Sequence, residues 1–351
     1  MNASPPLCPV TNPPRPRKRR LWSRILFYSF FAGFIGINCL AHFHARAMTT
    51  FVSTGARTAA PEKMNLLDKA KVLLTGVQFP RPENRRDPGD FGLEFQRHRY
   101  PGSLGLELEA WSVIPESAKG LVLMFHGNGA SKESLLPAAK IINGLGWGCA
   151  LIDFHGSGGS EGSTTSIGWH ESMDVVASHD HFFGKAPGGP IIHYGVSMGS
   201  AAVLRALHTD TIKPDGIILE LPFDRLINAA RQRFHALGLP SWPLADLLIL
   251  HGGWQQGFDG FAHAPSEYAK SIELPALVLN AERDRRAPPA QASAVFKALS
   301  GPKQRRQFAA LGHENICAAA PDEWRATVAA FLAEVVAISG GSSIDMLSNG
   351  E

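Results

Sequence analysis

Short, solidly apolar runs alternate with amphipathic segments over most of this chain. Five runs are typical of buried parallel strands: GLVLMF, GCALIDF, GPIIHYGV, DGIILEL and PALVLN. Most are separated by segments of helical period, such as SKESLLPAAKIINGLG and HESMDVVASHDHFF. Two earlier segments, FGLEFQRHRY and LGLELEAWSVIP, alternate polar and apolar residues and predict half-exposed antiparallel strands. The pattern therefore predicts an α/β fold with a mostly parallel, doubly wound sheet.

The N-terminal region departs from this rhythm. Residues 21–43 are almost continuously apolar and reach the length of about 20 residues that a bilayer requires. Basic residues at 15–20 precede them, which predicts a cytoplasmic N-terminus and a main domain on the far, periplasmic or extracytoplasmic side. Two alternatives stay open. One is an exported protein whose signal is cleaved near the small residues at 45–47; the other is a buried core helix, which the neighbouring arginines disfavour.

These patterns divide the chain into five parts. We predict a basic, proline-rich cytoplasmic tail (1–20), a transmembrane anchor (21–43) and a stalk with a leading helix (44–76). A main α/β domain (77–338) and a flexible tail (339–351) follow.

An insertion in the main domain, at about residues 224–272, contains the amphipathic segments DRLINAARQRFHALGLP and PLADLLILHGGW. They predict a small cap of two helices. Leu244, Leu247, Leu248 and Trp254 are candidate substrate-binding residues under this cap. The same spacing also suits plain packing against the main domain.

Charge and cysteine content exclude several function classes. The net charge is only +3, and much of the basic excess lies at residues 15–20, which argues against a nucleic-acid-binding body. The four cysteines are isolated, so neither a zinc site nor a disulfide framework is indicated. Separately, we expect an acyl-bearing small molecule and the membrane as partners, no nucleic acid, and no metal or organic cofactor.

Two stretches match Gly-x-Ser-x-Gly, the turn on which many serine hydrolases present their nucleophile: GGSEG at 158–162 and GVSMG at 195–199. The turn needs a strand directly before it and a helix directly after it. GVSMG ends the strand-like run PIIHY and is followed at once by the helical segment SAAVLRALH, whereas GGSEG is followed by a loop, STTSIGWH. The context therefore favours Ser197 over Ser160 as the nucleophile.

Partners for Ser197 follow other predicted strands, where ligands bind in such sheets. Asp284 follows PALVLN and His313 follows RRQFAAL, so Ser, Asp and His occur in the chain order of α/β hydrolases. Glu282 is a neighbouring alternative for the acid. The turn HGNGAS, which contains Asn128, follows GLVLMF and can direct a backbone N–H toward the nucleophile.

The stretches HGNG, DFHGSGGSEG, GVSMG, AERDRRAPP and GHEN make residues 77–338 similar to the α/β-hydrolase superfamily, in particular to its serine aminopeptidase (S33-like) and ABHD-type esterase group. The resemblance implies the α/β-hydrolase fold. Ser197, Asp284 and His313 match its nucleophile, acid and base, and Asn128 and Met198 match its oxyanion hole. A non-catalytic loop of the form G-x-G-x-S-x-G commonly follows the fourth strand in that group, as GSGGSEG does here.

The implied activity is hydrolysis of a carboxylic ester or thioester of a small to medium acyl substrate, through an acyl-enzyme on Ser197. A serine (amino)peptidase is the nearest alternative. It needs acidic residues in the cap to hold a free amine, and Asp246, Asp259 and Glu267 are the candidates. A non-catalytic, membrane-tethered binding module is the more distant alternative.

Overall fold

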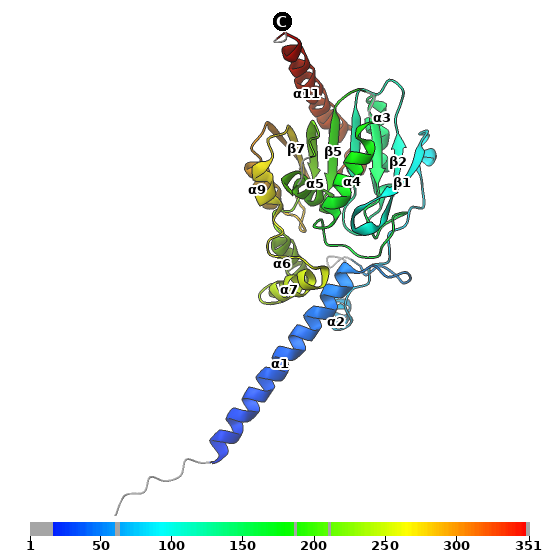
Figure 1. Cartoon of the computed structure of the whole chain (residues 1–351). Helices are drawn as coiled ribbons and strands as arrows, with labels where there is room; N and C mark the ends of the chain where they lie inside the picture. The colour runs from blue at the N-terminus through cyan, green and yellow to red at the C-terminus, as the bar shows by residue number, and fades with distance from the viewer. Residues whose placement is uncertain (1–16, 60–63, 186–187, 210–211, 349–351) are drawn as a thin grey trace, which may run out of the picture.

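The computed structural model describes residues 17–59, 64–185, 188–209 and 212–348 (Figure 1). Most of the predicted basic tail and the last three residues lie outside this part. Within it, eight strands form one sheet in the order β1-β2-β4-β3-β5-β6-β7-β8. Their bounds are β1 Gln96–Pro101, β2 Glu107–Val113, β3 Leu121–Phe125, β4 Gly148–Ile152, β5 Ile191–Val196, β6 Gly216–Glu220, β7 Ala276–Ala281 and β8 Lys303–Phe308. Only the pairings of β1 with β2 and of β2 with β4 are antiparallel, so the predicted mostly parallel sheet is confirmed.

Helices cover both faces of the sheet. One face carries α4 Glu171–Phe183, α5 Met198–Thr209, α8 Pro265–Tyr268 and α9 Pro289–Ala298. The other carries α3 Leu136–Gly144, α10 Ile316–Ala319 and α11 Pro321–Ser348. Short 3₁₀ turns complete the order: η2 Pro88–Phe91, η3 Ser103–Gly105, η4 Lys132–Leu135 and η5 Ala269–Ser271. This is the doubly wound arrangement that the alternation of apolar runs and amphipathic segments predicts.

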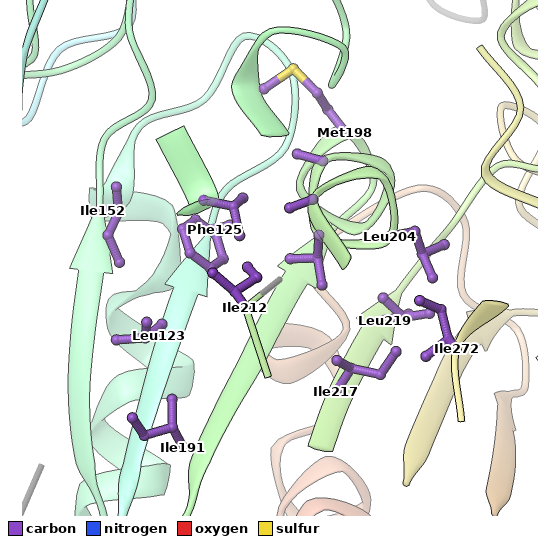
Figure 2. Packing of buried hydrophobic residues seen from close by; sticks show 14 of the residues in the cluster. Leu123, Phe125, Ile152, Ile191, Met198, Leu204, Ile212, Ile217, Leu219 and Ile272 are labelled. Atoms are coloured by element: carbon purple, nitrogen blue, oxygen red, sulfur yellow. The ribbon is translucent and has the colours of Figure 1, made fainter. Parts of the chain in front are cut away.

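The core between the sheet and the α4–α5 layer is aliphatic (Figure 2). Leu123 and Phe125 of β3 and Leu219 of β6 are fully buried there, together with Leu204 of α5. Val, Leu and Ile dominate because a parallel strand covered on both faces has no solvent-facing positions. The core fixes the sheet edge at which the strand ends meet.

The N-terminal helix α1 (Arg17–Thr49) runs away from the domain in Figure 1, and its stretch Leu21–Thr49 is long and apolar enough to cross a membrane. Near the domain, α1 packs against α7 (Leu244–Gln256) of the cap. Asn38 Oδ1 lies 3.2 Å from His251 Nε2, and Gln255 Nε2 donates to the carbonyl oxygen of His42 at 2.9 Å. Helix α1 is therefore packed on the cap and hydrogen-bonded to it.

Three further helices lie where the sequence pattern has helical segments. The cap consists of α6 (Leu226–Leu237) and α7, at the positions of the two amphipathic segments. The predicted leading helix is α2 (Leu66–Thr75), whose N-terminus is capped by the Asn65 side chain accepting from Asp68 N. In Figure 1, α2, α6 and α7 gather around the domain end of α1.

Strand β2 is not half-exposed as predicted, because its polar side chains bind buried partners. Glu109 accepts from the fully buried Lys132 Nζ at 2.8 Å. The same ammonium contacts the Asp153 carboxylate and lies 4.3 Å from the centre of the Trp111 ring. An alternating pattern predicts that one face of a strand is exposed to solvent. In this structure, that face of β2 is covered by the buried ion pairs of Lys132 with Glu109 and Asp153.

The C-terminal helix also differs from expectation, since α11 runs to Ser348 and not to the predicted tail boundary at residue 339. The glycines at 340 and 341 lie inside this helix. A glycine inside a helix costs only about 1 kcal/mol relative to alanine, which a long helix tolerates.

Buried acids hold the loop between β4 and α4. Glu171 accepts hydrogen bonds from Ser166 N at 3.0 Å and from Gly168 N at 2.9 Å. Behind it, His155 Nδ1 donates to Asp174 Oδ2 at 2.6 Å. Burial lowers the pKa of His155, but the bonded Asp174 carboxylate and nearby Glu171 outweigh burial and raise this pKa to about 9.

Removing the buried cation should destabilise the fold strongly. Lys132→Met leaves the Asp153 carboxylate buried without its counter-ion and leaves Glu109 only its contacts with the exposed Arg97 and Arg99. We expect a loss of about 3–5 kcal/mol in the free energy of unfolding. Lys270→Met is the control, because Lys270 pairs with Glu267 in an exposed ion pair and should change stability little. Denaturant titration of the two variants measures the difference, and equal midpoints would contradict a structural role for the network.

The His155–Asp174 pair predicts a pH-dependent stability. Because its folded-state pKa of about 9 lies above the usual value near 6.5, the stabilisation is complete below pH ~6.5 and is lost as pH rises through ~9. Asp174→Asn should therefore flatten the fall of the thermal midpoint between pH 6.5 and 9.5. Asp180→Asn, at an exposed position of the same helix, should keep the wild-type slope; a wild-type slope in Asp174→Asn would refute the assignment.

Candidate active site

Ser197 occupies a strained turn between a strand and a helix. Strand β5 ends at Val196 and α5 begins at Met198, and the φ of Ser197 is 52°. A Cβ on Gly195 would lie 2.5 Å from the carbonyl carbon of Gly199, and one on Gly199 would overlap the carbonyl oxygen of Phe125. Both glycines of GVSMG are therefore sterically required, as the geometry of a nucleophile turn demands.

The predicted acid and base are hydrogen-bonded to each other. Asp284 Oδ2 accepts from His313 Nδ1 at 2.7 Å, while Oδ1 accepts the backbone N–H groups of Arg286 and Ala287 at 2.7 and 2.9 Å. The buried carboxylate is thus fixed from three directions. Donation by Nδ1 leaves Nε2 of His313 as the proton acceptor.

The alternative acid, Glu282, points elsewhere. Its Oε2 accepts from the backbone N–H of Ala310 at 2.9 Å, and its side chain is exposed. Both residues follow β7, so only the direction in which the loop turns their side chains distinguishes them. The geometry favours Asp284 as the partner of His313.

Ser197, His313, Asn128 and Met198 line one cavity of about 570 Å³, where the carboxyl ends of the strands face the cap. This volume suits a small-molecule ligand, since ligand pockets usually measure about 300–1,000 Å³. The walls come from α6, α7, the β4–α4 loop and the last turn of α1. They are mostly apolar, and include Ala45, Met48, Ile167, Leu221, Phe223, Leu226, Ala230, Leu248, Ile249 and Phe258.

Asn128 lies in the turn after β3 and lines the same cavity as Ser197. The buried side chain of His126 supports this turn. Its Nδ1 donates to Gly127 O at 2.9 Å, and its Nε2 accepts from Phe154 N at 3.2 Å. Burial lowers the pKa of His126, so the ring stays neutral and supports the loop. Met198 begins α5, where backbone N–H groups have no partner within the helix. The two predicted oxyanion-hole residues therefore border the same cavity as Ser197.

The structure brings only part of the predicted cap set to the cavity. Leu248 lines it, and Leu244 lines a smaller cavity next to it. Leu247 and Trp254 are absent from the described walls of both. Trp254 is 73% exposed, and its ring lies 5.9 Å from that of His42 on α1. A helical spacing of apolar residues did not distinguish the cavity side of α7 from the side that meets α1.

Ser160 of the second Gly-x-Ser-x-Gly stretch is part of the buried framework. Its Oγ donates to Asp153 O at 2.7 Å and accepts from Glu109 N at 2.8 Å. The next α-helix begins only at Glu171, so the prediction that this serine lacks its helix is confirmed.

Sequence reasoning missed one residue that holds the histidine loop. Glu220, the last residue of β6, accepts from Tyr194 Oη at 2.8 Å and Trp324 Nε1 at 2.9 Å. It also accepts from Ile316 N at 3.3 Å, three residues beyond His313. Burial raises the pKa of this carboxyl. An acid at the end of an apolar run was the available signal, but the pattern did not show which partners it would meet.

In the part of the chain that the structure describes, no group of three or more His, Cys, Asp or Glu side chains is placed to hold a metal ion. The cavity does bring together a hydroxyl on a strained turn and an imidazole oriented by a carboxylate, groups of the kind that acyl transfer uses.

Similarities to known proteins agree with this chemistry. A family model described as serine aminopeptidase, S33, matches residues 116–247. The chain is 25% identical over 208 residues to the uncharacterized protein YqkD of Bacillus subtilis, covering 58% of this chain and 68% of that protein. It is 24% identical over 238 residues to lysophosphatidylserine lipase ABHD12 of Xenopus tropicalis, covering 61% of this chain. It spans only 60% of that lipase's length.

Among solved structures, the Pyrococcus furiosus esterase Pf2001 superimposes with a TM-score of 0.62 at 20% identity, covering 73% of this chain and 97% of the esterase. A likeness at this identity shows the fold. This enzyme therefore has the α/β-hydrolase fold, and its sequence is similar to α/β hydrolases of the ABHD and S33 group.

Proposed function

We propose that this enzyme is a serine hydrolase that cleaves a carboxylic ester, or a thioester, of a small to medium acyl substrate. The observation that carries the proposal is the hydrogen-bonded Asp284–His313 pair, which opens into the same cavity as Ser197 on its strained turn. This is the combination of groups that an acyl-enzyme mechanism requires.

In the proposed reaction, Ser197 Oγ attacks the ester carbonyl while His313 Nε2 takes its proton. Asp284 holds the imidazole by its Nδ1–H and stabilises the imidazolium. The backbone N–H groups of Asn128 and Met198 stabilise the oxyanion of the tetrahedral intermediate. His313 then protonates the leaving alcohol or thiol. Water, deprotonated by the same imidazole, cleaves the acyl-enzyme and releases the acid.

The placement of acidic residues favours an esterase over an aminopeptidase. Asp246 pairs with Arg231 at 3.5 Å, Glu267 pairs with Lys270 at 2.7 Å, and Asp259 Oδ1 accepts from Phe261 N at 2.9 Å. All three lie outside the described cavity lining, so these candidates do not provide a site for a free amine.

A peptidase remains the second candidate function because one acid does reach the cavity. Glu314, beside the histidine, lines it and accepts from Gly312 N at 3.2 Å. The non-catalytic binding module is not retained, since the chain belongs with enzymes and carries the groups for catalysis.

The names of similar proteins narrow the substrate class. The Xenopus tropicalis protein ABHD12 is named a lysophosphatidylserine lipase, and the Pyrococcus furiosus protein Pf2001 is named an esterase. The chemistry that both names share is ester cleavage, and we carry this over to this chain. The catalytic cavity is mostly apolar, with Arg57, Arg233 and Arg286 also in its lining, and its apolar walls suit an acyl chain.

We also propose that α1 is retained as a membrane anchor, with a cytoplasmic N-terminus and the catalytic domain on the far side. The most apolar window of α1 is not buried, which argues against a core helix. Cleavage near residues 45–47 would cut inside a helix and would remove Ala45, which is 1% exposed and lines the cavity. An intact α1 therefore suits the catalytic cavity.

Ser197→Ala should abolish hydrolysis of p-nitrophenyl esters, with a loss of at least about 10⁴-fold in kcat, because the nucleophile is removed. It should also abolish labelling by a fluorophosphonate probe. Steady-state kinetics of the full-length enzyme in detergent measure the loss.

Ser160→Ala is the matched control. It should lower stability by about 1–3 kcal/mol through lost buried hydrogen bonds, yet keep turnover per folded molecule within about twofold. Equal losses in both variants would refute Ser197 as nucleophile. Aminoacyl p-nitroanilides cleaved faster than the esters would favour the peptidase.

A further inference from the structure

A second cavity, of about 60 Å³, lies where α1, α2 and the two cap helices meet. Ile37, Leu40, Ala41, His44 and Met48 of α1 form one wall, and Val72 and Leu73 of α2 another. The cap contributes Arg233, Phe234, Leu237, Leu244 and Leu248. The lining is almost wholly aliphatic or aromatic. We propose that this cavity is the subsite for the acyl chain of the substrate, an inference that rests on the proposed ester hydrolysis.

The cavity is too large and too apolar to be an ordinary packing gap. Protein interiors contain few voids larger than one water molecule, and a water needs about 10–15 Å³ of such space. The volume of about 60 Å³ therefore admits several groups of that size. The His44 imidazole, one of its few polar groups, already meets Leu73 O at 2.9 Å. Because the cavity is half open and its lining is apolar, an apolar group that enters it is removed from water, which is favourable.

The subsite adjoins the catalytic cavity directly. Met48, Arg233 and Leu248 line both cavities, so the two spaces share a wall between α1 and the cap. A chain whose ester carbonyl lies at Ser197 reaches the small cavity by passing these three side chains. The aliphatic part of the Arg233 side chain can border such a chain while its guanidinium lies 5.6 Å from the centre of the Phe79 ring.

The position on α1 identifies the occupant as an acyl chain that comes from a bilayer. Ile37 and Leu40 belong to the stretch Leu21–Thr49 that is apolar enough to span a membrane. A chain that leaves the bilayer along α1 therefore meets the small cavity before it meets the catalytic serine. The small cavity thus comes before Ser197 along this route, which suits a lipid ester with one acyl chain and a polar head group.

Several contacts hold the walls together. Lys69 Nζ on α2 donates to Ala236 O on α6 at 3.3 Å, and Gln255 on α7 donates to the His42 carbonyl of α1. Ala45 of α1 packs closely on α7, where a Cβ on Gly252 would lie 3.8 Å from the Cβ of Ala45. The subsite is thus built from four helices, of which one is the proposed membrane anchor.

Filling the cavity from two opposite walls tests the proposal. In the full-length enzyme in detergent micelles, Val72→Trp on α2 and Leu244→Trp on α7 should each lower kcat/KM for p-nitrophenyl dodecanoate at least tenfold. Hydrolysis of p-nitrophenyl butanoate should stay within twofold of wild type, because its chain ends before the cavity. Retained butanoate hydrolysis also shows that the variants are folded.

The matched controls place the same bulk on exposed positions of the same two helices. Ala70→Trp on α2 and Leu250→Trp on α7, where Leu250 is 53% exposed, should leave both esters unaffected. Leu244→Ala enlarges the cavity and should raise the hexadecanoate-to-dodecanoate ratio of kcat/KM about threefold.

Three results would overturn the subsite: equal loss for both esters in the filling variants, no difference from the controls, or a wild-type enzyme that hydrolyses butanoate but not dodecanoate. Failure of the proposed function looks different. In that case Ser197→Ala would hydrolyse butanoate as fast as the wild type, or the wild type would not react with the fluorophosphonate probe.

Discussion

The turn between β5 and α5 leaves no room for a side chain at either flanking glycine, and the site is arranged around this constraint. Gly199 lies directly on the end of β3, so the helix that follows Ser197 starts against the neighbouring strand. Because β3 and β5 are adjacent and parallel, the loop with Asn128 emerges beside Ser197. The φ of 52° at Ser197 is held by this packing, and by the bond from Ser197 N to Glu220 O at 2.7 Å.

Buried charges position the loops around this turn. Lys132 joins Glu109 and Asp153 beneath the loop that carries Ser160, and Glu220 joins β6 to the start of α10 just beyond His313. Asp284 is held by two backbone N–H groups before it meets the histidine. Each carboxylate is satisfied by several donors, which is the condition under which a buried charge can be retained. The catalytic geometry thus depends on polar groups as much as on the aliphatic core.

In our proposal, helix α1 connects the membrane to the catalytic cavity. Its last turns pack on α7 and form walls of both cavities, so anchor and substrate site share residues such as Met48. As a proposed anchor, α1 would set the orientation of the domain relative to the membrane. Because α1 also lines the cavity, it would set the route by which an apolar substrate enters as well. In a smaller domain with a flexible tether, these two properties would be independent.

The sequence by itself determined the strands, the two cap helices and the apolar N-terminal helix, and it predicts Ser197 rather than Ser160 as the nucleophile. Each follows from local periodicity or from the residues directly before and after a turn. Only the tertiary structure shows that Asp284, and not Glu282, is hydrogen-bonded to His313. It also shows that the polar side of β2 is buried. On α7, it places Leu248 at the cavity and Trp254 against α1. These outcomes depend on which distant segment covers a given face, and a hydrophobic pattern records only that a face is covered. The contribution of α1 to the substrate cavity was hidden for the same reason, since an apolar helix has the same composition whether it meets lipid or a cap.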